Sequence, residues 1–159
     1  MFESANTSLF LLFNRDFCDI FPKINDTLLI QKLTGARHFI YMLSLVVEDD
    51  AGLRFIYEHI LTQAGFKVLL AEDGEKAVEY LNKETPNILF LDILLPRMNG
   101  IEVLAQIAKI PRLSAMLIVI VTSNRMFEVE IPQGLTVQFL VKPIRPDQIR
   151  QLAAMAIKT

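Results

Sequence analysis

The chain has little cysteine, no long apolar run and little net charge. Its 159 residues include one cysteine, Cys18, which cannot form an internal disulfide and fits a reducing cytoplasm. No run reaches the roughly 18 apolar residues that a membrane-spanning helix needs. Glu3 precedes the short apolar stretch at residues 9–13, where a secretory signal would carry a positive charge, so we expect no signal peptide. With a net charge of −2, nothing indicates binding to nucleic acid or to an anionic membrane.

What the chain does have is a regular alternation of two kinds of segment. Apolar residues make up 52% of the sequence, enough for the core of one domain. From residue 44 onward, short apolar segments alternate with segments whose apolar residues recur at helical spacing, the first of these being Leu53, Ile56, Tyr57, Ile60 and Leu61. The expected strands are residues 45–47, 67–71, 87–91, 116–121 and 137–141. The expected helices lie between residues 50 and 65 and at residues 74–82, 101–110 and 146–158. The continuously apolar strands predict an α/β fold, a doubly wound five-stranded parallel sheet with helices on both faces.

Two parts of the chain fit this pattern poorly. The fourth helix has only residues 124–133 to form it, and Pro132 would cost roughly 3 kcal/mol inside a helix, so we expect it to be short, irregular or absent. Residues 1–43 contain no β-α unit. We interpret them as an N-terminal extension of unknown role, with a flexible tail, a partner-binding segment and a non-native start as the alternatives. Met42 is a candidate start for the working domain, residues 44–159.

Polar side chains follow four of the expected strands. They are Glu48, Asp49 and Asp50 after the first, Asp92 after the third, Thr122 and Ser123 after the fourth, and Lys142 after the fifth. The carboxyl ends of parallel strands lie at one edge of the sheet, so we expect these groups to converge. Clustered carboxylates need a cation, and oxygen ligands without histidine or cysteine favour Mg²⁺ over zinc. A carboxylate beside Mg²⁺ can act as a nucleophile and form an aspartyl phosphate, which a lysine and a hydroxyl would stabilise.

Four motifs together resemble those of the response-regulator receiver domain of two-component signalling. They are "LVVEDD" (45–50), "LFLDILLPRMNG" (89–100), "IVIVTS" (118–123) and "FLVKPI" (139–144), in this order. The resemblance extends over residues 42–158 and implies a flavodoxin-like (βα)5 fold with strand order 2-1-3-4-5.

The resemblance also implies a role for each matching residue. The implied roles are phospho-acceptor for Asp92; Mg²⁺ ligands for Asp49, Asp92 and the backbone carbonyl of Leu94, with Glu48 acting through water; phosphate-binding and switch residues for Thr122, Lys142 and Phe139; and a cis peptide bond before Pro143. Asp50 is interpreted more simply as the N-cap of the first helix.

Two residues depart from the family pattern. Phe139 lacks the hydroxyl of the tyrosine common at the switch position, which leaves a steric rotamer switch or a core aromatic ring without a switching role. Leu94 occupies a position that tunes the loss of the phosphoryl group in this family. Its apolar side chain cannot orient an attacking water by hydrogen bonding, so we expect a long-lived phosphoryl group.

The leading interpretation is a single-domain response regulator, because the sequence ends after the last expected helix; an isolated fragment of a larger protein is the rival explanation. It would take a phosphoryl group on Asp92 from a histidine kinase or phosphotransfer protein and signal in the cytoplasm by contact with a downstream protein. The oligomeric state stays open, a dimer included. One alternative is a receiver-like binding module that works without phosphorylation. A phosphatase is disfavoured, because Leu94 stands where such enzymes often carry a second aspartate; we therefore expect self-phosphorylation and slow self-release rather than enzymatic turnover.

Overall fold

The computed structural model describes residues 42–123 and 131–157. The chain divides into two compact units, Met1–Phe39 and Ile40–Thr159, and all described residues belong to the second. The predicted N-terminal extension therefore lies almost entirely outside the described residues, as do residues 124–130 of the expected fourth helix. Within the described ranges, no helix combines the length and the apolar character needed to cross a membrane.

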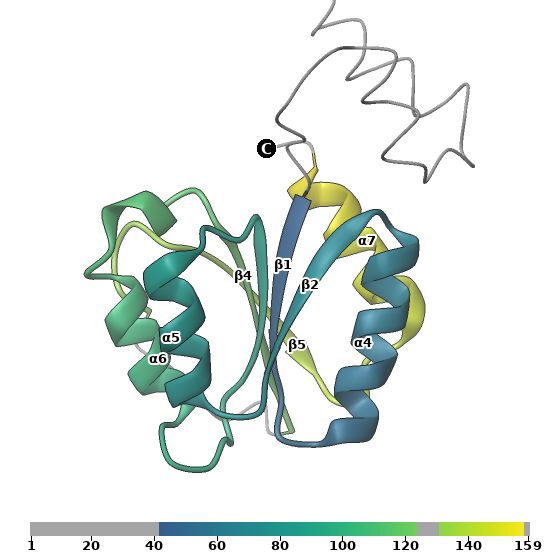
Figure 1. The fold of residues 1–159 in the computed structure, drawn as a ribbon, viewed down its shortest axis with the longest axis horizontal. Helices are drawn as coiled ribbons and strands as arrows, with labels where there is room; N and C mark the ends of the chain where they lie inside the picture. The colour runs from purple at the N-terminus through teal and green to yellow at the C-terminus, as the bar shows by residue number, and fades with distance from the viewer. Residues whose placement is uncertain (1–41, 124–130, 158–159) are drawn as a thin grey trace, which may run out of the picture. The chain divides into compact units, whose positions relative to one another are not determined.

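The described unit is a five-stranded parallel sheet with helices on both faces (Figure 1). Its elements in chain order are β1 (Met42–Val47), α4 (Ala51–Gln63), β2 (Phe66–Ala71), α5 (Gly74–Lys83), β3 (Ile88–Asp92), α6 (Gly100–Ile107), the 3₁₀ turn η1 (Pro111–Leu113), β4 (Leu117–Thr122), β5 (Thr136–Val141) and α7 (Pro146–Ala156). The strands lie in the order β2-β1-β3-β4-β5, which confirms the predicted doubly wound topology. Helices α5 and α6 cover one face and α4 and α7 the other (Figure 1).

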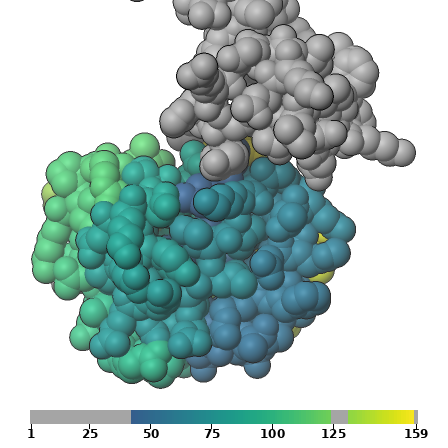
Figure 2. Space-filling model, viewed as in Figure 1, coloured from purple at the N-terminus to yellow at the C-terminus, as the bar shows by residue number. Residues whose placement is uncertain are grey.

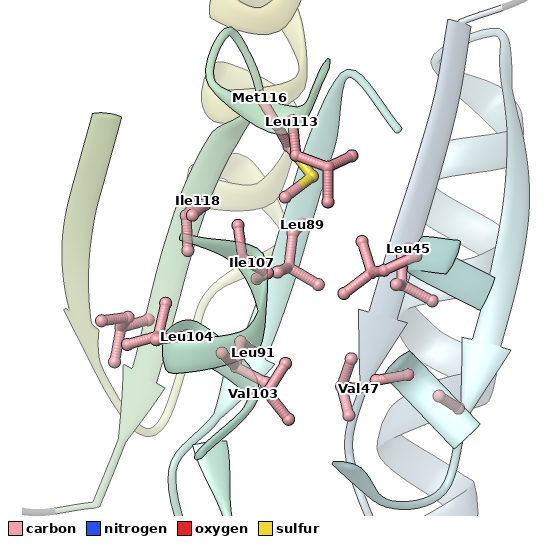
Figure 3. Packing of buried hydrophobic residues seen from close by; sticks show 14 of the residues in the cluster. Leu45, Val47, Leu89, Leu91, Val103, Leu104, Ile107, Leu113, Met116 and Ile118 are labelled. Carbon is pink, nitrogen blue, oxygen red and sulfur yellow. The ribbon is translucent and has the colours of Figure 1, made fainter. Parts of the chain in front are cut away.

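Each face of the sheet has its own apolar core, because successive strand residues point to opposite faces. The core beneath α5 and α6 is shown in Figure 3 and includes Leu45, Val47, Leu89, Leu91, Val103, Leu104 and Ile107. The alternate strand residues, such as Val46 and Phe90, join the core beneath α4 and α7. The space-filling view shows α5 and α6 side by side in contact with one another (Figure 2). Burial on both faces explains why the central strands are continuously apolar in sequence.

Side-chain caps determine where three of the helices begin. Asp50 precedes α4, Asp73 precedes α5 and Asn99 precedes α6, and each side chain accepts a hydrogen bond from a backbone N–H two or three residues further on. The prediction that Asp50 caps the first helix is thus confirmed. These three helices follow strands directly or after a short loop. The caps therefore also determine where the loops at the carboxyl edge of the sheet end.

The strand of the first β-α unit begins earlier than predicted, and its helix buries only part of its apolar side. β1 begins at Met42 rather than at residue 45, because Ser44 and its neighbours already pair with β2, and Ser44 pairs with β3 as well. Leu53 and Ile56 fit the helical spacing but are exposed, because α4 turns only the side that carries Tyr57, Ile60 and Leu61 toward the sheet.

The second half of the domain differs from the prediction in the length of one helix. The helix expected at residues 101–110 ends at Ile107, and the turn η1 follows it, with Pro111 at its first position. Of the expected fourth helix, only residues 131–133 are described, and they are not helical. Pro132 lacks the N–H that a helix interior would use, which agrees with this local conformation.

Candidate functional site

Charged and hydroxyl side chains from four strands meet at the carboxyl edge of the sheet, the lower edge in Figure 1. Glu48 follows β1, Asp92 is the last residue of β3, Thr122 is the last of β4, and Lys142 follows β5. All five strands are parallel, so their carboxyl ends lie together even where the residues are far apart in sequence.

Lys142 joins two buried carboxylates at this edge. Its Nζ lies 2.8 Å from Glu48 Oε2 and 2.9 Å from Glu48 Oε1, and 2.5 Å from Asp92 Oδ2. The side chains of Glu48 and Asp92 are 3% and 5% exposed, and that of Lys142 is 22% exposed. The ammonium group therefore compensates two negative charges whose burial would otherwise be strongly unfavourable.

Burial and charge have opposing effects on the pKa values here. Burial raises the pKa of Glu48, and the hydrogen bond and positive charge of Lys142 offset only part of that rise. Burial by itself would lower the pKa of Lys142, but its hydrogen bonds to Asp92 and Glu48 outweigh this, and the pKa lies above its ordinary value. Lys142 is therefore protonated at neutral pH and supplies a fixed positive charge beside Asp92.

Asp49 lies at the exposed side of this cluster and completes a set of three acids. One carboxylate oxygen from each of Glu48, Asp49 and Asp92 lies within 4.8 Å of the other two. Hard oxygen ligands at this spacing, with no nitrogen or sulfur donor among them, fit Mg²⁺ better than a transition metal. The donor set is thus suited to a magnesium ion held by one or two carboxylates that keeps part of its water shell.

The loop that follows β3 folds back tightly onto Asp92. The backbone N–H of Leu94 donates to Asp92 Oδ1 at 2.9 Å, and the N–H of Gly100 donates to the carbonyl oxygen of Ile93 at 3.0 Å. A Cβ on Gly100 would lie 2.4 Å from the carbonyl oxygen of Asp92, so a side chain at this position would force the loop away. Asp92 is therefore held by Leu94 through one carboxylate oxygen and by Lys142 through the other.

The family model for the response regulator receiver domain matches residues 44–154 of this chain. The chain belongs to the response regulator receiver domain family. Among curated relatives, the chemotaxis protein CheY of Listeria monocytogenes is 34% identical over 120 residues, which cover 74% of this chain and 100% of that protein. CheY of Thermotoga maritima is 31% identical over 106 residues, which cover 66% of this chain and 88% of that protein. The similarity therefore spans most or all of each chemotaxis protein.

Solved structures of receiver domains share the fold. The chemotaxis response regulator CheY4 of Vibrio cholerae matches with a TM-score of 0.64 and 24% identity, over 73% of this chain and 98% of that one. The receiver domain of the sensor histidine kinase PA1611 from Pseudomonas aeruginosa PAO1 matches with a TM-score of 0.66 and 22% identity, over 75% of this chain and 99% of that one. That structure has a magnesium ion coordinated in its active site cleft.

In this receiver domain, Thr122 and Lys142 are connected through the backbone. Thr122 is buried and pairs with Val141 across β4 and β5. The N–H of Lys142 donates to the carbonyl oxygen of Thr122 at 2.9 Å, and the peptide bond between Lys142 and Pro143 is cis, as predicted. The end of β4 thus sets the position from which Lys142 reaches the acids. The switch role of the Thr122 hydroxyl stays a prediction.

Phe139 lies on β5, the edge strand of the receiver sheet, and is 46% exposed. The alternative that this ring is a core aromatic is wrong, because nearly half of Phe139 is open to solvent. Its role as a switch residue stays a prediction.

Two residues beside the site were missed by sequence reasoning. Arg54 Nη1 donates to the backbone carbonyl oxygens of Glu48 and Asp49, both at 2.7 Å, and so holds the acidic turn. Tyr57 is buried close to the cluster, where burial and the negative charges of Glu48 and Asp92 raise the pKa of its hydroxyl. Arg54 could have been found from the sequence, because it is a cation one helical turn after the acidic stretch. Tyr57 could not, because it lies among residues that have the spacing of a helix core.

A pocket of about 390 Å³ adjoins the charged cluster between the start of α4 and the β5–α7 connection. Its apolar lining residues are Leu53, Ile56, Tyr57, Pro143, Ile144 and Ile149, and Glu48 and Lys142 also border it. The phosphorylation site predicted from the sequence thus has an apolar pocket directly beside its charged groups.

Proposed function

We propose that this receiver domain accepts a phosphoryl group on Asp92 from a histidine kinase or a histidine phosphotransfer protein, with Mg²⁺ as cofactor, and signals in the cytoplasm by contact with a downstream protein. The observation that carries this proposal is the placement of Asp92. Its buried carboxylate lies between the N–H of Leu94 and the ammonium group of Lys142, and Glu48 and Asp49 lie beside it.

The chemistry requires one bond to form and one to break. A carboxylate oxygen of Asp92 bonds to phosphorus while the bond between phosphorus and the imidazole nitrogen of the donor breaks, and the electron pair of that bond leaves with the imidazole. Lys142 lies close enough to Asp92 to move its positive charge onto a phosphoryl oxygen as that bond forms. A bound Mg²⁺ would neutralise negative charge on the carboxylates and the phosphoryl oxygens. Glu48, Asp49 and Asp92 are the side chains that would hold it.

The apolar pocket beside the site fits contact with a protein donor. The exposed Leu53 and Ile56 of α4 line this pocket together with Ile144. Apolar side chains left in solvent beside a charged reaction centre are the kind of surface that a protein partner buries. A partner docked there would bring its phosphohistidine next to Asp92.

Incubation with a small phospho-donor such as acetyl phosphate, with and without Mg²⁺, tests the proposal by intact-mass measurement. The wild-type protein should gain one phosphoryl group only when Mg²⁺ is present. Asp92→Asn should gain none, and Asp147→Asn, which changes an exposed acid on α7, should behave as the wild type does. No incorporation into the wild-type protein at any Mg²⁺ concentration would favour a binding module that works without phosphorylation.

The phosphoryl group should be long-lived. The side chain of Leu94 is exposed and apolar, so it offers no hydrogen bond to a water molecule that approaches the phosphoryl group on Asp92. The decay of the phosphorylated form after removal of the donor measures this. Complete loss within seconds would contradict the expectation, and Leu94→Asn, which restores a hydrogen-bonding side chain, should decay faster than the wild type.

A further inference from the structure

Arg97 has an unusual backbone conformation in the loop between β3 and α6. Its φ is 64°, and it is the one non-glycine residue of the described ranges with a positive φ. L-residues other than asparagine and aspartate rarely adopt this conformation, and it persists only where surrounding contacts impose it. The contacts that hold Arg97 in place therefore indicate what the loop is built to do.

The guanidinium of Arg97 reaches across to the start of α5. It forms an ion pair with Asp73, and it lies 3.5 Å from a carboxylate oxygen of Glu72 and 3.7 Å from one of Glu75. Glu72 and Glu75 are well exposed, so solvent screens these two contacts. Asp73 is 2% exposed and also caps α5, accepting the N–H of Lys76 at 2.7 Å. The buried Asp73 is thus the contact that can hold Arg97.

The next residue of the loop contacts the same helix through its backbone. A Cβ on Gly74, the first residue of α5, would lie 2.3 Å from the carbonyl oxygen of Met98. The backbone of Met98 therefore lies directly against Gly74, at a distance that only glycine permits. Arg97 and Met98 together attach the loop to the start of α5, by an ion pair and by a close backbone contact.

The other end of this loop holds the phosphorylation site. The N–H of Leu94 donates to Asp92 Oδ1 at 2.9 Å, and Leu94 is three residues before Arg97. Leu95 and Met98 donate backbone hydrogen bonds to Ile93 and Pro96, and their side chains pack against the core beneath α5 and α6. Arg97 lies between these two residues, so its ion pair with Asp73 adds a fixed point in the part of the loop that leads back to Leu94.

We propose that Arg97 is a positioning residue for the phosphorylation site, which ties the β3–α6 loop to Asp73 so that the backbone of Leu94 stays aligned on Asp92. The inference rests on the proposed function, because the groups aligned in this way are those that would receive Mg²⁺ and the phosphoryl group. Arg97 contacts neither of them. It acts through the loop, and its removal loosens the loop in the absence of any ligand.

Two substitutions at this position separate positioning from stability. Arg97→Gly and Arg97→Ala both remove the ion pair, but glycine adopts a positive φ at no steric cost and alanine does not. Arg97→Gly should therefore be more stable than Arg97→Ala in thermal unfolding, while both lose the ion pair with Asp73 and keep the backbone contact of Met98 with Gly74. Arg97→Lys keeps the charge and should recover part of the function. Arg150→Ala, at an exposed arginine of α7, makes the same change in net charge as a control.

Two readouts apply to these variants. Amide hydrogen exchange without Mg²⁺ should show faster exchange at Leu94 in Arg97→Gly and Arg97→Ala than in the wild type and Arg150→Ala. Calorimetric titration with Mg²⁺ should show an affinity weaker by about tenfold in the same two variants, the lower end of the effect known for groups that hold metal ligands in place. If Mg²⁺ binding is weakened equally in the glycine and alanine variants although their stability differs, the effect comes from the position of the loop and not from the stability of the fold.

The outcomes that overturn the inference differ from those that overturn the proposed function. If Arg97→Gly keeps wild-type exchange at Leu94 and wild-type Mg²⁺ affinity, Arg97 has no positioning role, whatever the wild-type protein does with phosphate. An Mg²⁺ affinity that follows thermal stability across the variants also overturns it. If the wild-type protein itself binds no Mg²⁺ and takes no phosphoryl group, the proposed function fails and the inference fails with it.

Discussion

Replacing Lys142 by methionine should expose how the buried acids are compensated. Methionine keeps an unbranched side chain of similar length but removes the ammonium group that lies within 2.9 Å of Glu48 and Asp92. Breaking a buried ion pair by removing one partner costs about 3–5 kcal/mol. Lys142 is 22% exposed, so solvent compensates part of the loss, and we expect about 3 kcal/mol at neutral pH.

The loss should depend on pH with a definite sign. Burial already raises the pKa of Glu48 in the folded protein, and the hydrogen bond and the charge that partly offset this rise both come from Lys142. A carboxyl whose folded pKa is raised binds more protons in the folded than in the unfolded state, so its contribution to stability is full below the unfolded pKa and is lost as pH rises through the folded pKa. Lys142→Met should therefore be closer to the wild type at about pH 5 than at about pH 7.5.

Urea unfolding followed by far-ultraviolet circular dichroism measures this, since the chain has no tryptophan. At about 2 kcal/mol per molar urea, the expected loss lowers the midpoint by about 1.5 M at neutral pH. Addition of about 10 mM Mg²⁺ should stabilise Lys142→Met more than the wild type, because the cation takes over the role of the ammonium group. Lys83→Met, at a lysine 67% exposed, should change little. Equal midpoint shifts at both pH values, or no shift at all, would refute this account of the buried charges.

Three further substitutions test other parts of the structure. Gly74→Ala should destabilise the domain by about 1–3 kcal/mol in urea unfolding, because its Cβ would lie 2.3 Å from a carbonyl oxygen of Met98; an unchanged midpoint would mean that the loop is not held there. Asp50→Ala should cost about 1 kcal/mol through loss of the α4 cap yet keep wild-type Mg²⁺ affinity in a calorimetric titration, and a large drop in affinity would make Asp50 a metal ligand instead. Phe139→Ala should cost far less than the about 3–5 kcal/mol expected for Phe90→Ala, since the ring of Phe139 is half exposed and that of Phe90 is buried, and equal losses of stability would contradict the exposed placement.

The placement of the charged groups at the carboxyl edge of the sheet could be predicted from the sequence because it depends on topology alone. Glu48 and Lys142 follow strands and Asp92 ends one, and parallel strands end at a common edge. Neither the lengths of the loops nor the rotamers of the side chains enter that argument. The same reasoning cannot say that Lys142 contacts both acids at once, since this depends on how far each side chain reaches across the edge.

The parts that sequence reasoning missed depend on side-chain reach and on partial burial. The ion pair of Arg97 with Asp73 joins two loops, and no pattern in either segment predicts this pairing. The pair forms because the backbone of Arg97 adopts a positive φ, which the sequence does not indicate. Leu53 and Ile56 have the spacing of a buried face, but the apolar stripe of α4 is wider than the strip that the sheet covers. Hydrophobic periodicity predicts which side of a helix is apolar, and packing decides how much of that side is buried.

The order of the strands along the chain also matters while the protein is being made. Glu48 follows the first strand and Asp92 ends the third, whereas Lys142 follows β5, the last strand of the sheet to leave the ribosome. Until β5 pairs with β4, a sheet formed by the earlier four strands would bury two carboxylates without their ammonium partner, an arrangement that costs free energy. This cost disfavours formation of a stable core before β5 has been added to the sheet. Because Lys142 follows the last strand, the charge balance around Asp92 is complete only in a chain whose sheet is fully assembled.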